Sequence, residues 1–215
     1  SWACIMCTRC HEVCPAHESG TSLSPSAMEI NKRYFINEQG NSLFNGAADT
    51  ALLDYAISDD AVWSCTTCYA CVQVCPVGNE PMMDILELRR KEVYDAKIPD
   101  ELADVLRSLD EKGNSFNESE RRRSRWSRTL DFKLKDATKE PVKYLWYVGD
   151  FASFNQICQD TTRKVAEVLM VAGVDFGIMG KKEKSAGNDV RRVGEEGLFE
   201  VLAEQNIESI ESCEF

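Results

Sequence analysis

The sequence predicts a protein of the α plus α/β class, with a mainly helical first part and a strand-helix-strand-helix second part. In the first part, a run of four cysteines and a proline occurs twice among short segments of helical periodicity. From residue 141 onward, short apolar runs alternate with longer amphipathic segments, which is the pattern of a parallel sheet covered by helices. We therefore expect domains at 1–98 and 141–215, with a helical connector at 99–140.

The two cysteine runs share the spacing C-x2-C-x2-C-x3-C-P and contain eight of the ten cysteines. This is the spacing of bacterial two-cluster ferredoxins, in which three close thiolates bind one cluster and the fourth cysteine reaches the other. The sequence thus predicts an all-helical ferredoxin domain with two [4Fe-4S] clusters. The expected ligand sets are Cys4, Cys7, Cys10 and Cys75 for one cluster, and Cys65, Cys68, Cys71 and Cys14 for the other.

Two other uses of the cysteines remain alternatives. Zinc also binds thiolates, but it needs only four ligands and gains nothing from a third cysteine two residues further on. An even number of cysteines suits a disulfide framework too, but such frameworks are typical of small secreted domains. This chain has 215 residues and is 43% apolar, which favours iron-sulfur clusters.

Charge and hydropathy limit the possible partners. The formal charge of -11 argues against nucleic acid, because phosphate binding needs a basic face. No apolar run approaches the roughly 20 residues needed to span a bilayer. One basic run, 121–128, stands out; we interpret it as a solvated helix or linker, with docking to an acidic partner or lipid headgroups as the alternative.

The start of the chain also carries an expectation. Ser1 lies three residues before the first ligand cysteine, with neither an initiating methionine nor a signal peptide. We expect a piece of a longer chain.

Several helices are expected in the first part and the connector. Ser26 is a candidate cap for a helix from Ala27, and the polar stretch 37–46 should separate it from a helix at 47–57. Pro81 suits the first position of the next helix. In the connector, we expect an amphipathic helix at 99–109, which the segment around Gly113 interrupts. We expect the arginine run to form a second helix.

The second part is predicted to contain two strands and two helices. The strands are expected at 144–149 and 174–179, and the helices at 155–172 and 190–205. Two strands seldom form a stable sheet alone, so we expect further strands beyond Phe215.

These motifs resemble those of the (Fe-S) oxidoreductases related to heterodisulfide reductase, a group that includes lactate and glycolate oxidase iron-sulfur subunits. The resemblance is carried by both cysteine runs and by the segments 63–68, 147–149, 172–177 and 188–196. It implies a helical ferredoxin domain followed by a cysteine-rich "CCG" domain, whose cysteines bind a special iron-sulfur centre.

At the positions of those cysteines, this chain has other residues. Asp150 follows the Tyr-Val-Gly segment, and Ser185-Ala186-Gly187 stands where the family has Cys-Cys-Gly. Asp and Ser oxygens are hard ligands and Ala is none, so a soft iron-sulfur centre should not assemble there. The resemblance therefore implies a degenerate, truncated CCG-like domain.

Other residues have smaller expected roles. His11 lies inside the first run where the second has Val72, so the two clusters should differ in reduction potential. His17 is expected at the surface without a partner. Cys158 and Cys213 are expected to be ordinary apolar side chains. No nucleotide site is expected, because no G-x-G-x-x-G follows the first strand.

The predicted function is a single-electron relay through two [4Fe-4S] clusters, between a flavin or quinone partner and another redox centre, with no catalytic residue in this chain. The partners would be other redox subunits of a complex, in the cytoplasm or at the cytoplasmic face of a membrane. One alternative is a catalytic (Fe-S) oxidoreductase acting at the CCG domain, with Asp150 and Ser185 as altered ligands. A zinc scaffold is another.

Overall fold

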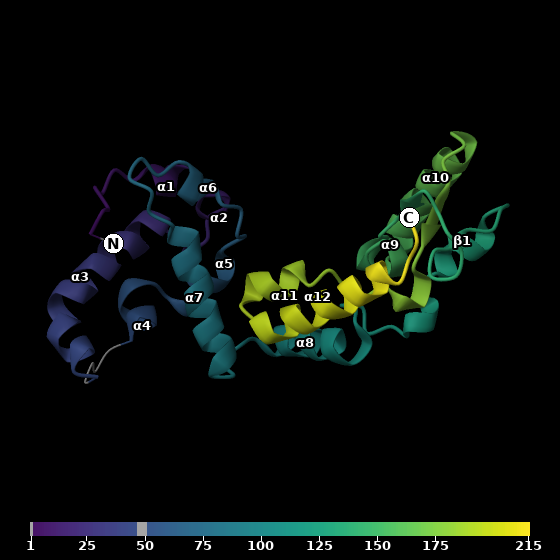
Figure 1. Ribbon diagram of the computed structural model, residues 1–215. Coiled ribbons are helices and arrows are strands. Elements are labelled where there is room, and N and C mark those ends of the chain that lie inside the picture. The colour runs from purple at the N-terminus through teal and green to yellow at the C-terminus, as the bar shows by residue number, and fades with distance from the viewer. Residues whose placement is uncertain (1, 47–50) are drawn as a thin grey trace. The chain divides into compact units, whose positions relative to one another are not determined.

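The computed structural model describes residues 2–46 and 51–215, which are mostly helical with a small parallel sheet (Figure 1). The chain forms two compact units. Unit 1 comprises Ser1–Lys97 with Arg192–Gly194, and unit 2 comprises Ile98–Arg191 with Glu195–Phe215. The coarse expectation of helices plus a small α/β sheet is confirmed. No helix in the described ranges is long and apolar enough to cross a membrane.

Unit 1 consists of helices and turns around one apolar core. Its helices are α1 (Arg9–Glu12), α2 (Pro15–Glu18), α3 (Pro25–Phe44), α4 (Leu52–Ala56), α5 (Asp59–Ser64), α6 (Ala70–Gln73) and α7 (Pro81–Tyr94). The core contains Leu23, Met28, Val62 and Ile85, each at most 2% exposed. Cys14 belongs to the same core, so one of the expected ligands lies in the packed interior.

Helix α3 differs from the sequence-based expectation at both ends. It begins at Pro25, and its cap is Ser24, whose Oγ accepts from the Ala27 amide at 3.2 Å. It also runs through the polar stretch 37–46 as far as Phe44 instead of ending before it. Contacts with α4 account for this, because the Tyr55 hydroxyl donates to Glu38 at 2.7 Å and the Tyr55 ring packs on Phe35 at 5.3 Å.

The remaining helices of this part follow the sequence more closely. The helix expected at 47–57 falls partly on residues 47–50, which lie outside the described residues, and α4 covers the rest. Pro81 is the first residue of α7, as predicted. The connector helix α8 (Asp100–Lys112) ends at Gly113, whose φ of 66° is the left-handed conformation that glycine favours at helix ends.

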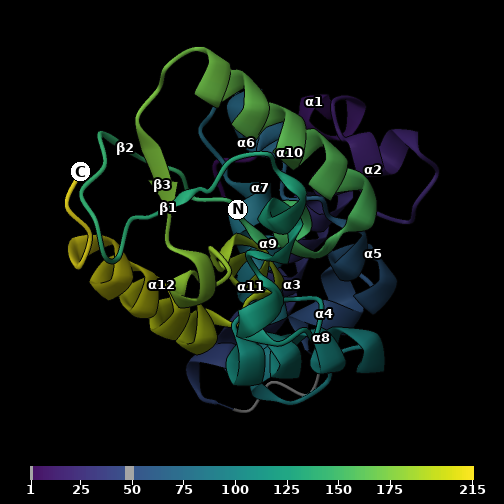
Figure 2. The same ribbon diagram turned by 90° about the vertical axis from the view of Figure 1, so that its right-hand side faces the viewer.

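Unit 2 combines α8 with a three-stranded sheet and further helices (Figure 2). Its other elements are η1 (Glu120–Arg122), η2 (Arg125–Thr129), β1 (Lys135–Asp136), β2 (Tyr144–Leu145), α9 (Asp150–Phe154), α10 (Gln156–Val171), β3 (Phe176–Ile178), η3 (Gly180–Lys182), α11 (Asn188–Val193) and α12 (Glu196–Glu211). Helix α10 packs on the sheet through Ala166 and Leu169, which join Phe176 and Ile178 in one apolar cluster.

The sheet has the order β1-β3-β2, and both pairings are parallel. Lys135 pairs with Gly177, and Tyr144 pairs with Phe176. Gly177 allows the close approach of β1, since a Cβ there would lie 3.0 Å from the Lys135 carbonyl oxygen and 2.8 Å from the Val142 side chain. The third strand therefore comes from the segment before residue 141.

The arginine run was expected to be one helix and instead forms the two short 3-10 helices η1 and η2. Trp126 explains the difference. Its ring is 2% exposed and packs edge-on against Trp146 at 5.7 Å, which fixes the segment against the apolar cluster of the sheet. This packing contact, which local periodicity does not reveal, determines the backbone there.

Candidate iron-sulfur centres

The two cysteine runs adopt the same backbone conformation. Each ends in a single helical turn, α1 in the first run and α6 in the second, and the two turns lie side by side (Figure 1). Left-handed residues also recur at equivalent positions. Met6 (φ 57°) corresponds to Thr67 (φ 51°), and Thr8 (φ 59°) corresponds to Tyr69 (φ 70°).

These left-handed residues are strained, since a non-glycine residue pays about 1–2 kcal/mol for that conformation. Such strain persists where the surrounding structure imposes it, and it is commonly found at functional sites. Here the backbone turns amide groups toward sulfur. The Thr67 amide donates to Cys65 Sγ at 3.4 Å, and the Asn79 amide donates to Cys75 Sγ at 3.2 Å. N–H···S bonds of this kind stabilise cluster thiolates and adjust the reduction potential.

One cavity of unit 1 is lined by cysteines from both runs. Its lining includes Cys4, Cys7 and Cys10 of the first run together with Cys75 of the second. These are the four residues expected to share one cluster. The rest of the lining combines apolar residues, among them Ile5, Met6, Val77 and Pro81, with an equal number of polar ones. The cavity thus gathers soft ligands, which suits a [4Fe-4S] cluster.

The second set of cysteines gathers around the other run. Burial raises the pKa of Cys65, with the thiols of Cys14 and Cys68 acting on it as further neighbours. Burial also raises the pKa of Cys71 to about 11, with contributions from Cys65, Cys10 and Cys68. Cys65 packs against the core cluster that contains Cys14, so Cys14 lies near a thiol of the opposite run. No group of three or more His, Cys, Asp or Glu within the described ranges is arranged to hold a single metal ion.

The second cysteine is the exposed one in both runs, namely Cys7 in the first and Cys68 in the second. The buried cysteine differs, because it is the fourth of the first run, Cys14, and the third of the second run, Cys71. Each group of thiols consequently reaches the surface through the same position of its run.

The charged groups around the two sites differ. Glu29, 1% exposed, lines the first cavity and accepts from Lys32 at 3.0 Å and Asn79 at 3.3 Å. Burial, and then the side chain of Asp84, raise the pKa of Glu29. Near the second group, the buried guanidinium of Arg89 donates to the Cys65 carbonyl at 2.7 Å. A buried carboxyl thus adjoins one site and a buried cation the other.

His17 was expected to lie at the surface without a partner, and this was wrong. Its ring lies 3.6 Å from the ring of His11, and both residues are half-buried. The Nδ1 atom of His11 in turn hydrogen-bonds with Ser24 Oγ at 2.8 Å. The two rings meet because the chain turns back into α2 directly after the first run.

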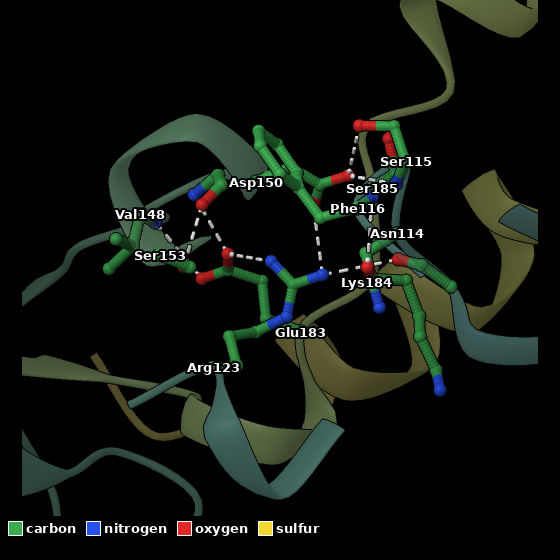
Figure 3. Close-up of polar contacts among 12 residues, drawn as sticks. Asn114, Ser115, Phe116, Arg123, Val148, Asp150, Ser153, Glu183, Lys184 and Ser185 are labelled. Atoms are coloured by element: carbon green, nitrogen blue, oxygen red, sulfur yellow. Dashed lines mark hydrogen bonds and ion pairs between the residues drawn. The ribbon is translucent and has the colours of Figure 1, made fainter. Parts of the chain in front are cut away.

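In unit 2, Asp150 belongs to a buried ionic network around Arg123 (Figure 3). The Arg123 guanidinium, 2% exposed, donates to Asp150 Oδ1 at 2.8 Å, to Glu183 Oε1 at 3.1 Å and to the Gly113 carbonyl at 3.1 Å. The amide of Ser115 donates to the second oxygen of Asp150 at 3.0 Å. We call Arg123, Asp150 and Glu183 the Arg123 network.

Glu183 ties this network to the strand end beside it. It accepts from the amides of Val148 and Gly149 at 2.9 and 2.8 Å. Burial raises the pKa of Glu183, while these amides and Arg123 act in the opposite direction. Sequence reasoning missed both Arg123 and Glu183. The only available signal was the three-residue spacing between Arg123 and Trp126, which places both on one side of a helical turn.

Ser185 takes part in different contacts from Asp150. Its amide donates to the Gly113 carbonyl at 2.7 Å, and its hydroxyl accepts from the Gly187 amide at 3.4 Å. The two residues expected to replace family ligands therefore serve as hydrogen-bonding groups of the fold.

Comparison with known proteins agrees with the cysteine geometry. Residues 1–79 match the family model of the 4Fe-4S dicluster domain. A probable iron-sulfur-binding oxidoreductase of Bacillus subtilis, FadF, is 32% identical over 98% of this chain and 36% of its own length. A subunit of the dihydromethanophenazine:CoB--CoM heterodisulfide reductase of Methanosarcina barkeri is 24% identical over 97% of this chain and 52% of its own. The chain is thus similar to iron-sulfur proteins related to heterodisulfide reductase.

The EtfAB:quinone oxidoreductase of Syntrophomonas wolfei is 28% identical over 96% of this chain and 33% of its own length. The chain thus spans about a third to a half of the length of these relatives. The match of residues 1–79 to the dicluster domain supports [4Fe-4S] clusters as the cofactor of this chain. No solved structure matches.

Proposed function

We propose that this chain relays single electrons through two [4Fe-4S] clusters held by its first 98 residues. The observation that supports this most strongly is the cavity lined by Cys4, Cys7, Cys10 and Cys75, because it joins three cysteines of one run with the last cysteine of the other. When bound, such clusters supply centres that take up and release one electron at a time.

In this proposal the eight cysteines divide into two crossed sets. The first set is the one around the cavity, and the second is Cys65, Cys68 and Cys71 with Cys14. The packing of Cys65 against the core that contains Cys14 supports the second set. The amides of Thr67 and Asn79, which donate to ligand sulfurs, would hold the thiolates in place and favour their charged form.

The exposed residues Cys7 and Cys68 give each site one edge toward solvent. We infer that electrons enter and leave at these edges, while the lining shields the remainder. The net charge of -11 would favour partners with a basic docking face.

The proposed partners are other redox subunits of a complex, linked to a flavin or a quinone. The relative named EtfAB:quinone oxidoreductase supports this class. We place the complex in the cytoplasm or at the cytoplasmic face of a membrane, because exposed thiolates need a reducing environment.

We assign residues 141–215 as a degenerate CCG-like domain without a metal centre, and we include in it the expected connector 99–140, which supplies strand β1 and Arg123 to the same unit. The Arg123 network supports this assignment, because a guanidinium and two carboxylates occupy the surroundings of Asp150. Catalysis at that domain is therefore not part of the proposal.

The first test is metal analysis of the full chain purified under anaerobic conditions. We expect about eight irons and about eight sulfides per chain, and two centres that each accept one electron in a redox titration followed by electron paramagnetic resonance. The variants Cys158→Ser and Cys213→Ser are controls that should keep the full iron content. Zinc without sulfide would refute the relay, and a clear excess of iron with a further signal would favour catalysis at the CCG-like domain.

A further inference from the structure

Unit 2 contains a cleft of about 890 Å³, which we call the basic cleft. This volume falls in the range of small-molecule sites in proteins, about 300–1,000 Å³. We propose that the basic cleft binds a ligand that carries phosphate groups on a partly apolar body. The proposal concerns unit 2 alone and does not depend on the electron relay.

The basic cleft lies at the ends of two strands of the sheet. Strand β1 ends at Asp136, and Asp136, Thr138 and Lys139 line the cleft. Strand β3 ends at Ile178, and the segment 178–182 that follows lines it as well. The cleft therefore lies outside the carboxyl ends of two adjacent parallel strands, which is where ligands bind in open α/β sheets.

The lining of the basic cleft is rich in arginine and lysine. Five exposed cations of the lining make no ion pair or hydrogen bond through their side chains with any part of the chain that the structure describes: Arg121, Arg128, Lys133, Lys181 and Lys182. The two other cations are paired, Lys135 with Asp175 at 2.6 Å and Lys139 with Asp136. The exposed carboxylate of Asp131 also lines the cleft and offsets one of these charges. In a chain of net charge -11, the local excess of unpaired positive charge that is left favours an anion.

The chemistry of the donors narrows the class of anion. Arginine presents a planar fork of N–H groups that matches two phosphate oxygens, and lysines add point charges around it. Ser124, Ser127 and Thr138 also line the cleft, but the hydroxyls of Ser127 and Thr138 already donate to the Ser124 carbonyl and to Asp136. Several phosphate oxygens would use this set more fully than one carboxylate would.

The other side of the lining is apolar and includes Leu130, Phe132, Ile178 and Met179. Ile178 and Met179 are buried, at 6% and 2% exposure, so packing holds their side chains in place on this side of the cleft. A ligand with an apolar portion next to its phosphates would contact both sides. A soluble phosphate ester and the headgroup of an anionic lipid share this chemistry.

The test begins with inorganic pyrophosphate as the probe, titrated into the full chain by calorimetry at low ionic strength. We expect a dissociation constant of about 1 mM or below. The variant Arg128→Ser should weaken binding roughly tenfold, because it removes charge-assisted hydrogen bonds. The matched control is Arg125→Ser in the same 3-10 helix, whose side chain is exposed but does not line the cleft.

Arg125→Ser should leave the dissociation constant unchanged, and circular dichroism of both variants checks that they fold. The double variant Lys181→Ser/Lys182→Ser should weaken binding at least as much as Arg128→Ser. Equal losses in Arg125→Ser and Arg128→Ser would overturn the proposal, because they would reveal general charge attraction instead of a site.

Vesicles distinguish the two sources of phosphate. Sedimentation with phosphatidylglycerol vesicles, but not with phosphatidylcholine vesicles, together with competition by pyrophosphate, would assign the cleft to a lipid headgroup. Pyrophosphate binding without vesicle binding would assign it to a soluble ester. Binding of neither probe, or binding of polyglutamate that pyrophosphate does not displace, would refute a phosphate site.

Discussion

The cysteine sites of unit 1 and the Arg123 network of unit 2 stand at two positions where the family resemblance implies iron-sulfur chemistry. At the first, thiols of both runs line one cavity. At the second, Asp150 holds a buried arginine instead of a metal centre. The comparison teaches that buried polar groups are stable in an interior when they satisfy one another, as Arg123, Asp150 and Glu183 do, whereas gathered thiols suit a soft metal cluster.

The two sites also differ in what they need from a cofactor. Burial raises the pKa of Cys10 and Cys71 to about 11, so these thiols are uncharged at neutral pH until a metal displaces their protons. The Arg123 network is internally paired. Unit 1 should therefore gain stability from its clusters, whereas unit 2 should stand without any.

The sharpest way to break the comparison is to test crossed ligation by pairs of substitutions. Cys14→Ser/Cys65→Ser should remove only one cluster and leave about four irons, because both residues belong to one set. Cys14→Ser/Cys4→Ser should remove both clusters and nearly all iron. Iron and sulfide analysis distinguishes these outcomes, and the reverse pattern would mean that each run closes its own cluster.

The next largest effect should come from Arg123. Arg123→Met leaves Asp150 and Glu183 buried without their cation, so the free energy of unfolding should fall by about 3–5 kcal/mol. Arg122, which is exposed and paired with Glu118, is the matched control, and Arg122→Met should cost about 0–1 kcal/mol.

Urea denaturation measures both values for these arginine variants. Iron content should stay at the wild-type level in each. Loss of iron on changing Arg123 would contradict the separation of the two sites.

A smaller effect is expected at Glu29. Glu29→Gln removes a buried carboxyl from the lining of the first cavity, so the potential of the cluster there should rise by tens of millivolts. Glu12→Gln changes an exposed residue of the same unit. It should shift the potential of that cluster less than Glu29→Gln does, because solvent screens the charge of Glu12. A potentiometric titration resolves the two centres, and an equal shift of both would show that Glu29 acts only through net charge.

The smallest effect concerns backbone strain in the second run. Thr67→Gly relieves a left-handed threonine, so the chain should gain about 0.5–1 kcal/mol after the flexibility of glycine is counted. The neighbouring Thr66 has no positive φ, and Thr66→Gly should destabilise by about 0.5–1 kcal/mol. Urea denaturation of both variants measures these changes in the free energy of unfolding. If both variants are less stable than the wild type, Thr67 makes contacts that offset its backbone strain.

The sequence predicted best those features that depend on local spacing. The start of α7 at Pro81 and the end of α8 at Gly113 follow from single residues with strong backbone preferences. The sequence-based prediction was wrong where contacts between distant parts of the chain determine the secondary structure. Strand β1 exists because Gly177 lets it approach, and α3 continues because Tyr55 holds Glu38.

The candidate sites show the same division. The cysteines are evident from a repeated spacing, which no other residue type in the chain shares. The burial of Arg123 depends on Asp150 and Glu183, which lie 27 and 60 residues away along the chain. Within the arginine run, only the three-residue spacing to Trp126 sets the buried arginine apart from its exposed neighbours Arg121 and Arg122.

The cavity that joins Cys10 to Cys75 has a consequence for biosynthesis. During translation the first three thiols leave the ribosome well before the fourth, and the enclosure has no closing side until the second run has emerged and folded. With the proposed ligand sets, cluster loading would follow synthesis of the chain through Cys75. A nascent chain stalled before residue 75 would present the first three thiols of the set without the fourth.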